Sequence, residues 1–104
     1  LTSPPDTRSK NRFPINSDSI GIAFNNIAQE LKLNFWDLRY QMGGNGSLFK
    51  WLKNSLASKD QLHFTKEGYT LQAKLLTIAI FDAFNNVVGE NEKLKLPLIN
   101  QNFK

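Results

Sequence analysis

The chain has 104 residues, enough for one domain, and its 40% hydrophobic and 12% aromatic residues can form a packed core. It contains no cysteine, which excludes disulfides and thiolate catalysis. The net charge of +4 does not by itself indicate a nucleic-acid-binding protein, because the thirteen basic residues are scattered and such a site needs them on one face. No apolar run is long enough to span a membrane.

The first 16 residues are predicted to form a loop, because three prolines and several polar residues among them prevent a regular helix or strand. The sequence begins at Leu1, without an initiator methionine, a charged leader or an apolar targeting run. We therefore expect the chain to be a processed or excised piece of a longer protein.

An amphipathic helix is predicted over residues 18–32, where apolar residues recur at helical spacing. Ser17 or Asp18 is placed to cap its first turn. The stripe that we expect to face the core consists of Ile20, Ala23, Phe24, Ile27, Ala28 and Leu31.

Residues 33–38 follow this helix directly, and their large apolar side chains are typical of a buried strand in a parallel sheet. Such a strand needs neighbours, because each buried backbone group left without a partner costs about 1–3 kcal/mol. The neighbours must come from sequence outside this chain, from the chain's own ends or from another copy.

Three glycines at positions 43, 44 and 46 interrupt the chain and form either a plain turn or a substrate-facing loop, since glycine lets backbone amides approach a ligand. Ser47 is predicted to cap a second, short helix. The apolar face of that helix contains Leu48, Trp51, Leu52 and Leu56.

A third helix is predicted over residues 66–86, with Thr65 as its cap and apolar residues on more than one side, so that we expect it to be widely buried. Residues 90–104 are predicted to be a tail that packs on the body or pairs at a sheet edge. The expected order is a loop over 1–16, a helix-strand-helix-loop-helix segment over 17–89 and a tail over 90–104. The content is mainly helical, with one or two strands.

His63 is the only histidine of the chain, and Asp60 lies three residues before it. A neutral imidazole, whose ordinary pKa is about 6.5, can accept a proton from a hydroxyl, and a carboxylate can fix its tautomer and stabilise the imidazolium. The same spacing is also common in surface and helix-capping histidines. A metal site formed by His63 with Asp37 or Asp60 has little support, since one histidine offers few nitrogen ligands.

The residues around this pair resemble the last conserved block of the SGNH, or GDSL-type, ester hydrolases. The likeness rests on Asp60-Gln61-Leu62-His63-Phe64-Thr65 and Gly68-Tyr69. Bacterial members related to cell-wall acyl hydrolases are similar at Phe35-Trp36-Asp37-Leu38, Met42-Gly43-Gly44, Gly46-Ser47 and Trp51. The resemblance covers roughly residues 1–85. It implies that the chain is the C-terminal portion of an α/β protein, a three-layer α/β/α sandwich with a flavodoxin-like parallel sheet.

By the same resemblance, Asp60 and His63 are two members of a Ser-His-Asp triad, with His63 as the base and Asp60 as the residue that orients it. The family's nucleophile block and its two oxyanion-hole blocks have no counterpart in this sequence. Ser47, which follows Gly46, comes nearest to the family's nucleophile motif, but a role as a helix cap explains a serine at this position better. The chain alone is therefore predicted to be inactive.

We hypothesise that the parent protein is a serine esterase for O-acyl or O-acetyl esters of a carbohydrate, with no cofactor and no metal. The expected partners are an acylated substrate and the missing N-terminal half of the domain, and the chain alone is expected to be oligomeric, molten or bound to that half. The resemblance alone implies a periplasmic or extracellular location. The alternative is a non-catalytic interaction module or pseudo-enzyme remnant; nucleic-acid binding ranks last.

Overall fold

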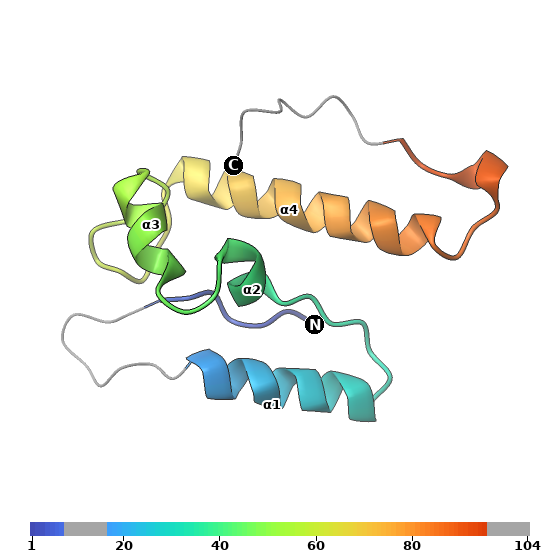
Figure 1. Ribbon diagram of the computed structural model, residues 1–104, viewed down its shortest axis with the longest axis horizontal. Coiled ribbons are helices and arrows are strands. Elements are labelled where there is room, and N and C mark those ends of the chain that lie inside the picture. Colours follow the sequence, from blue (N-terminus) through green and yellow to red (C-terminus); the bar gives the residue numbers. More distant parts are fainter. Residues whose placement is uncertain (8–16, 96–104) are drawn as a thin grey trace. The chain divides into compact units, whose positions relative to one another are not determined.

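The computed structural model describes residues 1–7 and 17–95, which are mainly helical, as predicted. Four α-helices occur in this part of the chain (Figure 1): α1 (Ser17–Glu30), α2 (Leu38–Met42), α3 (Ser47–Lys53) and α4 (Lys66–Asn85), followed by a 3-10 turn, η1 (Glu90–Glu92). The chain divides into two compact units, Leu1–Tyr69 and Thr70–Lys104. Helix α4 begins in the first unit and continues in the second.

The first unit contains a short parallel pairing between Thr2 and Trp36. The Ser3 N–H donates to the Trp36 carbonyl at 3.0 Å, and the Trp36 N–H donates to the Leu1 carbonyl at 2.8 Å. One of the three predicted sources of a neighbouring strand is therefore correct, namely the chain's own N-terminal end. The predicted strand over 33–38 is wrong in extent, because only Trp36 forms a bridge and helix α2 begins at Leu38.

Helix α2, which was not predicted, begins here because Asp37 caps it. The Asp37 Oδ1 accepts hydrogen bonds from the Tyr40 N–H at 3.0 Å and from the Ser3 hydroxyl at 2.9 Å. The same hydroxyl accepts a hydrogen bond from the Arg39 N–H at 3.2 Å, and Ser3 is buried. Ser3 and Asp37, which are 34 positions apart in the sequence, thus together fix the point at which the strand segment ends and α2 begins.

Helix α3 corresponds to the predicted second helix, but it ends at Lys53, so Leu56 of the predicted apolar face lies beyond it, and the predicted cap, Ser47, is wrong. The N-cap is Gly46 in the left-handed region, and the buried Ser47 hydroxyl has no hydrogen-bonding partner among the residues that the structure describes. The first turn is instead bound by the buried Asp6, whose Oδ2 accepts the Leu48 N–H at 2.9 Å. The other oxygen of Asp6 lies 3.6 Å from the Arg39 Nε. A distant carboxylate therefore satisfies the start of α3 and joins it to α2.

The core of the first unit forms around α3. Leu48 is fully buried, and the buried Trp51 indole N–H donates to the Met42 carbonyl at 3.0 Å. Phe64 packs edge-on against Trp51, with ring centroids 5.7 Å apart. These contacts attach α3 to the turn that precedes it and to the chain that follows it.

Helix α1 lies within two residues of its predicted bounds, but most of its predicted core-facing stripe is accessible. Ala28 is buried, whereas Ile20, Ile27 and Leu31 are exposed. Capping by Ser17 or Asp18 lies outside the described side chains, and residues 8–16 of the predicted N-terminal loop lie outside the described residues.

Helix α4 confirms the predicted third helix and its cap, since the Thr65 hydroxyl accepts the Gly68 N–H at 3.1 Å. The expectation that this helix is widely buried is wrong, because Gly68 is its one buried residue and Ile80 and Phe84 are exposed. In the second unit, the Asn85 side chain binds both backbone groups of Leu94. Residues 96–104 of the tail lie outside the described part of the chain.

None of the helices over residues 17–95 is sufficiently long and apolar to cross a membrane.

Candidate active site

Asp60 and His63 lie in the loop between α3 and α4. The His63 Nδ1 is 2.5 Å from the Asp60 Oδ2, and the two side chains are 66% and 49% exposed. The structure thus brings the two predicted site residues into direct contact at an accessible surface.

The second oxygen of Asp60 organises the loop. Its Oδ1 accepts the backbone N–H groups of Leu62 and His63, each at 2.9 Å. This turn is closed by Gln61, whose φ of +61° lies in the left-handed region. One carboxylate therefore shapes the backbone with one oxygen and holds the imidazole with the other.

These contacts keep Asp60 ionised. The backbone N–H of His63, the His63 ring and the backbone N–H of Leu62 hold the pKa of the Asp60 carboxyl well below its ordinary value. An ionised carboxylate only accepts hydrogen bonds, so the Nδ1 of His63 must carry the proton that lies between them. In a neutral ring, Nε2 is then the acceptor, and no residue in 1–7 or 17–95 hydrogen bonds to it. This is the tautomer required of a general base.

The loop that carries the pair is tied at its base. The Ser58 N–H donates to the His63 carbonyl at 2.9 Å, and Ala57 and Phe64 form an antiparallel bridge. The Thr65 hydroxyl donates to the Ser55 carbonyl at 2.8 Å. Below this base, the buried Phe64 contacts Tyr69 of α4 edge-on, with ring centroids 5.7 Å apart. The exposed pair therefore sits on a buried support.

Gly68 allows the first turn of α4 to press against this support. A Cβ added at Gly68 would lie 1.9 Å from the Leu56 carbonyl oxygen and 3.1 Å from the Phe64 Cβ. The Leu56 carbonyl also accepts the Thr65 N–H at 3.1 Å, so the backbone at this point is already fixed. Only glycine fits here.

We expect Gly68→Ala to lower the free energy of unfolding of the first unit by about 2 kcal/mol. Overpacking a filled site costs about 1–3 kcal/mol, and a clash with a backbone carbonyl has no rotamer that relieves it. The gain in helix propensity, about 1 kcal/mol at most, is smaller. Urea denaturation followed by tryptophan fluorescence measures the change, since both tryptophans lie in the first unit.

Gly89→Ala is the matched control. A Cβ at Gly89 meets no atom within 4 Å, and its φ of −68° suits any residue. The free energy of unfolding of this variant should lie within about 0.5 kcal/mol of that of the original chain. Equal stability of the two variants would contradict the close contact at Gly68.

An open groove of about 600 Å³ lies beside the loop. Its walls combine aliphatic and hydroxyl side chains with one lysine and one glutamine, and they comprise Leu52, Ser55, Ala57, Ser58, Lys59, Gln61 and Thr65. It gives a ligand space next to the residues that flank the pair.

The described residues provide neither a group of metal ligands nor a nucleophile for the pair. Within 1–7 and 17–95, no three His, Cys, Asp or Glu side chains are grouped so that they could hold a metal ion. Ser47 is buried in the first turn of α3, which removes the one serine with a partial resemblance to a nucleophile motif. The pair offers proton transfer, and this part of the chain presents no hydroxyl bound to it.

The roles of Ser3 and Asp6 were missed from the sequence, because their partners lie more than 30 residues away. Asp37 did carry a signal, since an aspartate before a short run of helix formers is a common cap. The apolar residues before it favoured a strand instead.

No family model matches the chain, and a search of curated proteins gave no match. A solved structure of a peptidoglycan O-acetylesterase has a similar fold, with a TM-score of 0.73 and 23% sequence identity over 83% of this chain and 26% of that one. The chain thus spans about a quarter of the length of that structure. At this identity the likeness shows the fold alone: an arrangement similar to the one described above occurs within that longer chain.

Proposed function

We propose that this chain is the C-terminal portion of an SGNH-type serine esterase and supplies the histidine and aspartate of its triad. The observation that carries the proposal is the 2.5 Å contact between the Asp60 Oδ2 and the His63 Nδ1 in an exposed loop. The similar fold of a peptidoglycan O-acetylesterase supports an acyl-esterase-like unit.

In the proposed reaction, the His63 Nε2 accepts the proton of a serine hydroxyl as that oxygen attacks the ester carbonyl. It then returns the proton to the departing alcohol, and the same sequence with water releases the acid. The Asp60 carboxylate stabilises the imidazolium that forms in each step. The serine and the oxyanion donors would come from polypeptide outside this chain.

The same proposal gives the parallel pairing of Thr2 and Trp36 a place in a larger sheet, the α/β/α sandwich implied by the sequence resemblance. Parallel sheets are usually covered by helices on both faces, and α1 is the connection between these two strand segments. O-acetyl esters of a carbohydrate are the proposed substrates, supported by the substrate that the name of the similar structure gives for that enzyme.

The proposal is tested by measuring hydrolysis of 4-nitrophenyl acetate and of an O-acetylated glycan. We expect the 104-residue chain alone to match the buffer rate and the same chain joined to a nucleophile-bearing N-terminal half to turn over both esters. A joined protein that is folded but inert toward both esters would refute the esterase function. Enzyme-like turnover by the chain alone would refute the assignment of the serine to another polypeptide.

A non-catalytic interaction module is the second candidate. It is favoured by the absence, within residues 1–7 and 17–95, of a hydroxyl bound to the His63 Nε2. The same assay separates the two functions, because a module of this kind would bind without hydrolysing either ester.

A further inference from the structure

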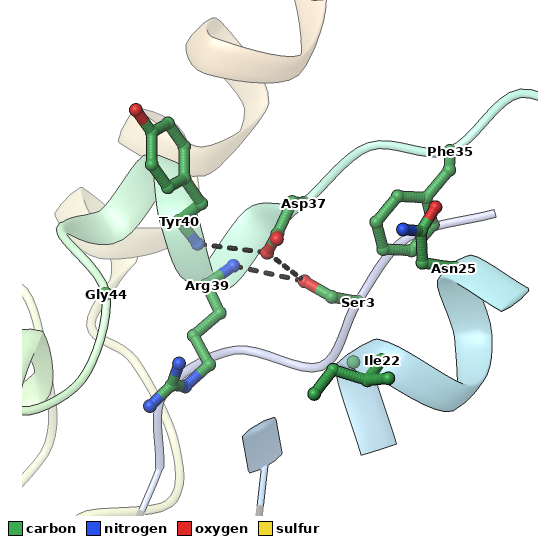
Figure 2. A pocket seen from close by; sticks show the side chains of 9 residues that line it. Ser3, Ile22, Asn25, Phe35, Asp37, Arg39, Tyr40 and Gly44 are labelled. Carbon is green, nitrogen blue, oxygen red and sulfur yellow. Dashed lines mark hydrogen bonds between the residues drawn. The ribbon is translucent and has the colours of Figure 1, made fainter. Parts of the chain in front are cut away.

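A second cavity lies in the first unit and is separate from the groove beside the Asp60–His63 loop. Its volume is about 280 Å³, and neither Asp60 nor His63 lines it. Its walls come from α1, from both segments of the parallel pairing and from α2 (Figure 2). Drug-sized ligands occupy clefts of about 300–1,000 Å³, so this cavity has room for a ligand of about one ring.

The polar wall of the cavity is held rigidly. The Ser3 hydroxyl donates to the Asp37 Oδ1 at 2.9 Å, and Figure 2 shows the two groups directed toward each other. The Tyr40 N–H donates to the same oxygen at 3.0 Å. The second oxygen, Oδ2, has no hydrogen-bonding partner in the described part of the chain. Asp37 therefore presents a fixed acceptor to the cavity.

The charge of the walls selects against anions. Arg39 also lines the cavity, but its Nε lies 3.6 Å from the Asp6 carboxylate, which neutralises it. The Asp37 carboxylate remains as the uncompensated charge. A phosphate or carboxylate ligand would be repelled, whereas a neutral hydroxyl group would donate to it.

The remaining wall is apolar, with one amide. Phe35 and Ile22 provide aromatic and aliphatic surface, and Asn25 adds a half-buried carboxamide from α1. This carboxamide has no hydrogen-bonding partner among residues 1–7 and 17–95. It can donate to one ligand atom and accept from another.

We infer that this cavity is a binding site for a neutral sugar ring. A hydroxyl of the sugar donates to the Asp37 Oδ2, the Asn25 carboxamide binds a second polar group, and the C–H face of the ring packs against Phe35. An N-acetylated sugar fits best, because its acetamido group offers Asn25 both a donor and an acceptor. This binding does not require ester hydrolysis at His63, although it would place a glycan on the same unit as the proposed esterase pair.

The test is a titration of the full chain with N,N'-diacetylchitobiose, followed by the shifts of the backbone amide signals in NMR spectra. We expect saturable shifts at Gly21 and Gly44, which line the cavity, and an Asn25→Ala variant that binds about fivefold more weakly through the loss of one or two hydrogen bonds. Asn25→Ala should remain folded, since alanine is favoured within a helix.

Asn26→Ala is the matched control, because Asn26 is the next residue of α1, is exposed and does not line the cavity. It should bind the disaccharide like the original chain. N-acetylglucosamine 6-phosphate should bind more weakly than N-acetylglucosamine. Three results would each overturn the inference. The two asparagine variants could weaken sugar binding equally, the NMR shifts could be confined to residues 58–65, or the phosphorylated sugar could bind more tightly than the neutral one. In the protein that joins this chain to its nucleophile-bearing half, loss of esterase activity in His63→Ala with sugar binding intact would separate the two sites.

Discussion

His63→Ala is expected to lower acyl-ester hydrolysis by about 10³-fold or more in a protein that joins this chain to its nucleophile-bearing half. Removing the base leaves the serine hydroxyl without a proton acceptor, and removing a triad member leaves the modest catalysis that comes from binding and the oxyanion hole. The kcat for a short aryl acetate, measured under saturating substrate, gives the change. The KM should move little, because the substrate-binding surfaces are untouched.

Asp60→Asn separates the two roles of the aspartate in the same assay. An asparagine oxygen can still accept the Leu62 and His63 N–H groups, so the loop should remain folded. Its NH₂ group, however, donates toward the His63 Nδ1 and favours the wrong tautomer, and a comparable change in a serine protease lowers kcat by about 10⁴-fold. Lys53→Ala, at an exposed end of α3, serves as the control and should retain full activity. Full esterase activity in the His63→Ala variant would show that His63 is not the catalytic base.

Asp6→Ala is expected to lower the free energy of unfolding of the first unit by about 3 kcal/mol. Asp6 is 1% exposed and satisfies both the Leu48 N–H and the Arg39 side chain. Removing one member of a buried charged pair leaves the other uncompensated, which costs about 3–5 kcal/mol, and partial access of water to Arg39 places this case at the lower end. Urea denaturation monitored by tryptophan fluorescence measures the loss.

Two further variants make this measurement specific. Asp6→Asn keeps an acceptor for the Leu48 N–H and loses only the charge opposite Arg39, so its cost should be about half as large. Asp82→Ala removes an exposed aspartate of α4 and should change stability by less than about 0.5 kcal/mol. If Asp6→Ala and Asp82→Ala were equally stable, Asp6 would not be the residue that fixes the start of α3.

The three longer helices were predictable because their signals are local. Apolar residues at helical spacing and the Thr65 cap lie within the segments that they define. Helix α2 was harder to predict, since it has only five residues and its local cap, Asp37, is held in addition by a hydrogen bond from Ser3 across 34 positions. The Ser47 cap failed for the same reason, because Asp6 binds the turn from 42 positions away.

The contact between Asp60 and His63 was predictable because it is also local, formed across three residues within one loop. The surroundings of the pair were not. The close approach of Gly68 to Leu56 and the cavity between α1 and α2 arise from packing between elements that are far apart in the sequence. Spacing patterns carry no information about such distances.

The shared use of the Asp60 carboxylate makes the orientation of the imidazole depend on the turn. Because one oxygen closes the turn and the other orients the ring, the imidazole cannot stay aligned if the turn opens. The turn, in contrast, can persist when the bond to the ring is lost. A substrate that contacts the loop would meet a base with a single orientation, so that binding and proton transfer depend on the same small turn.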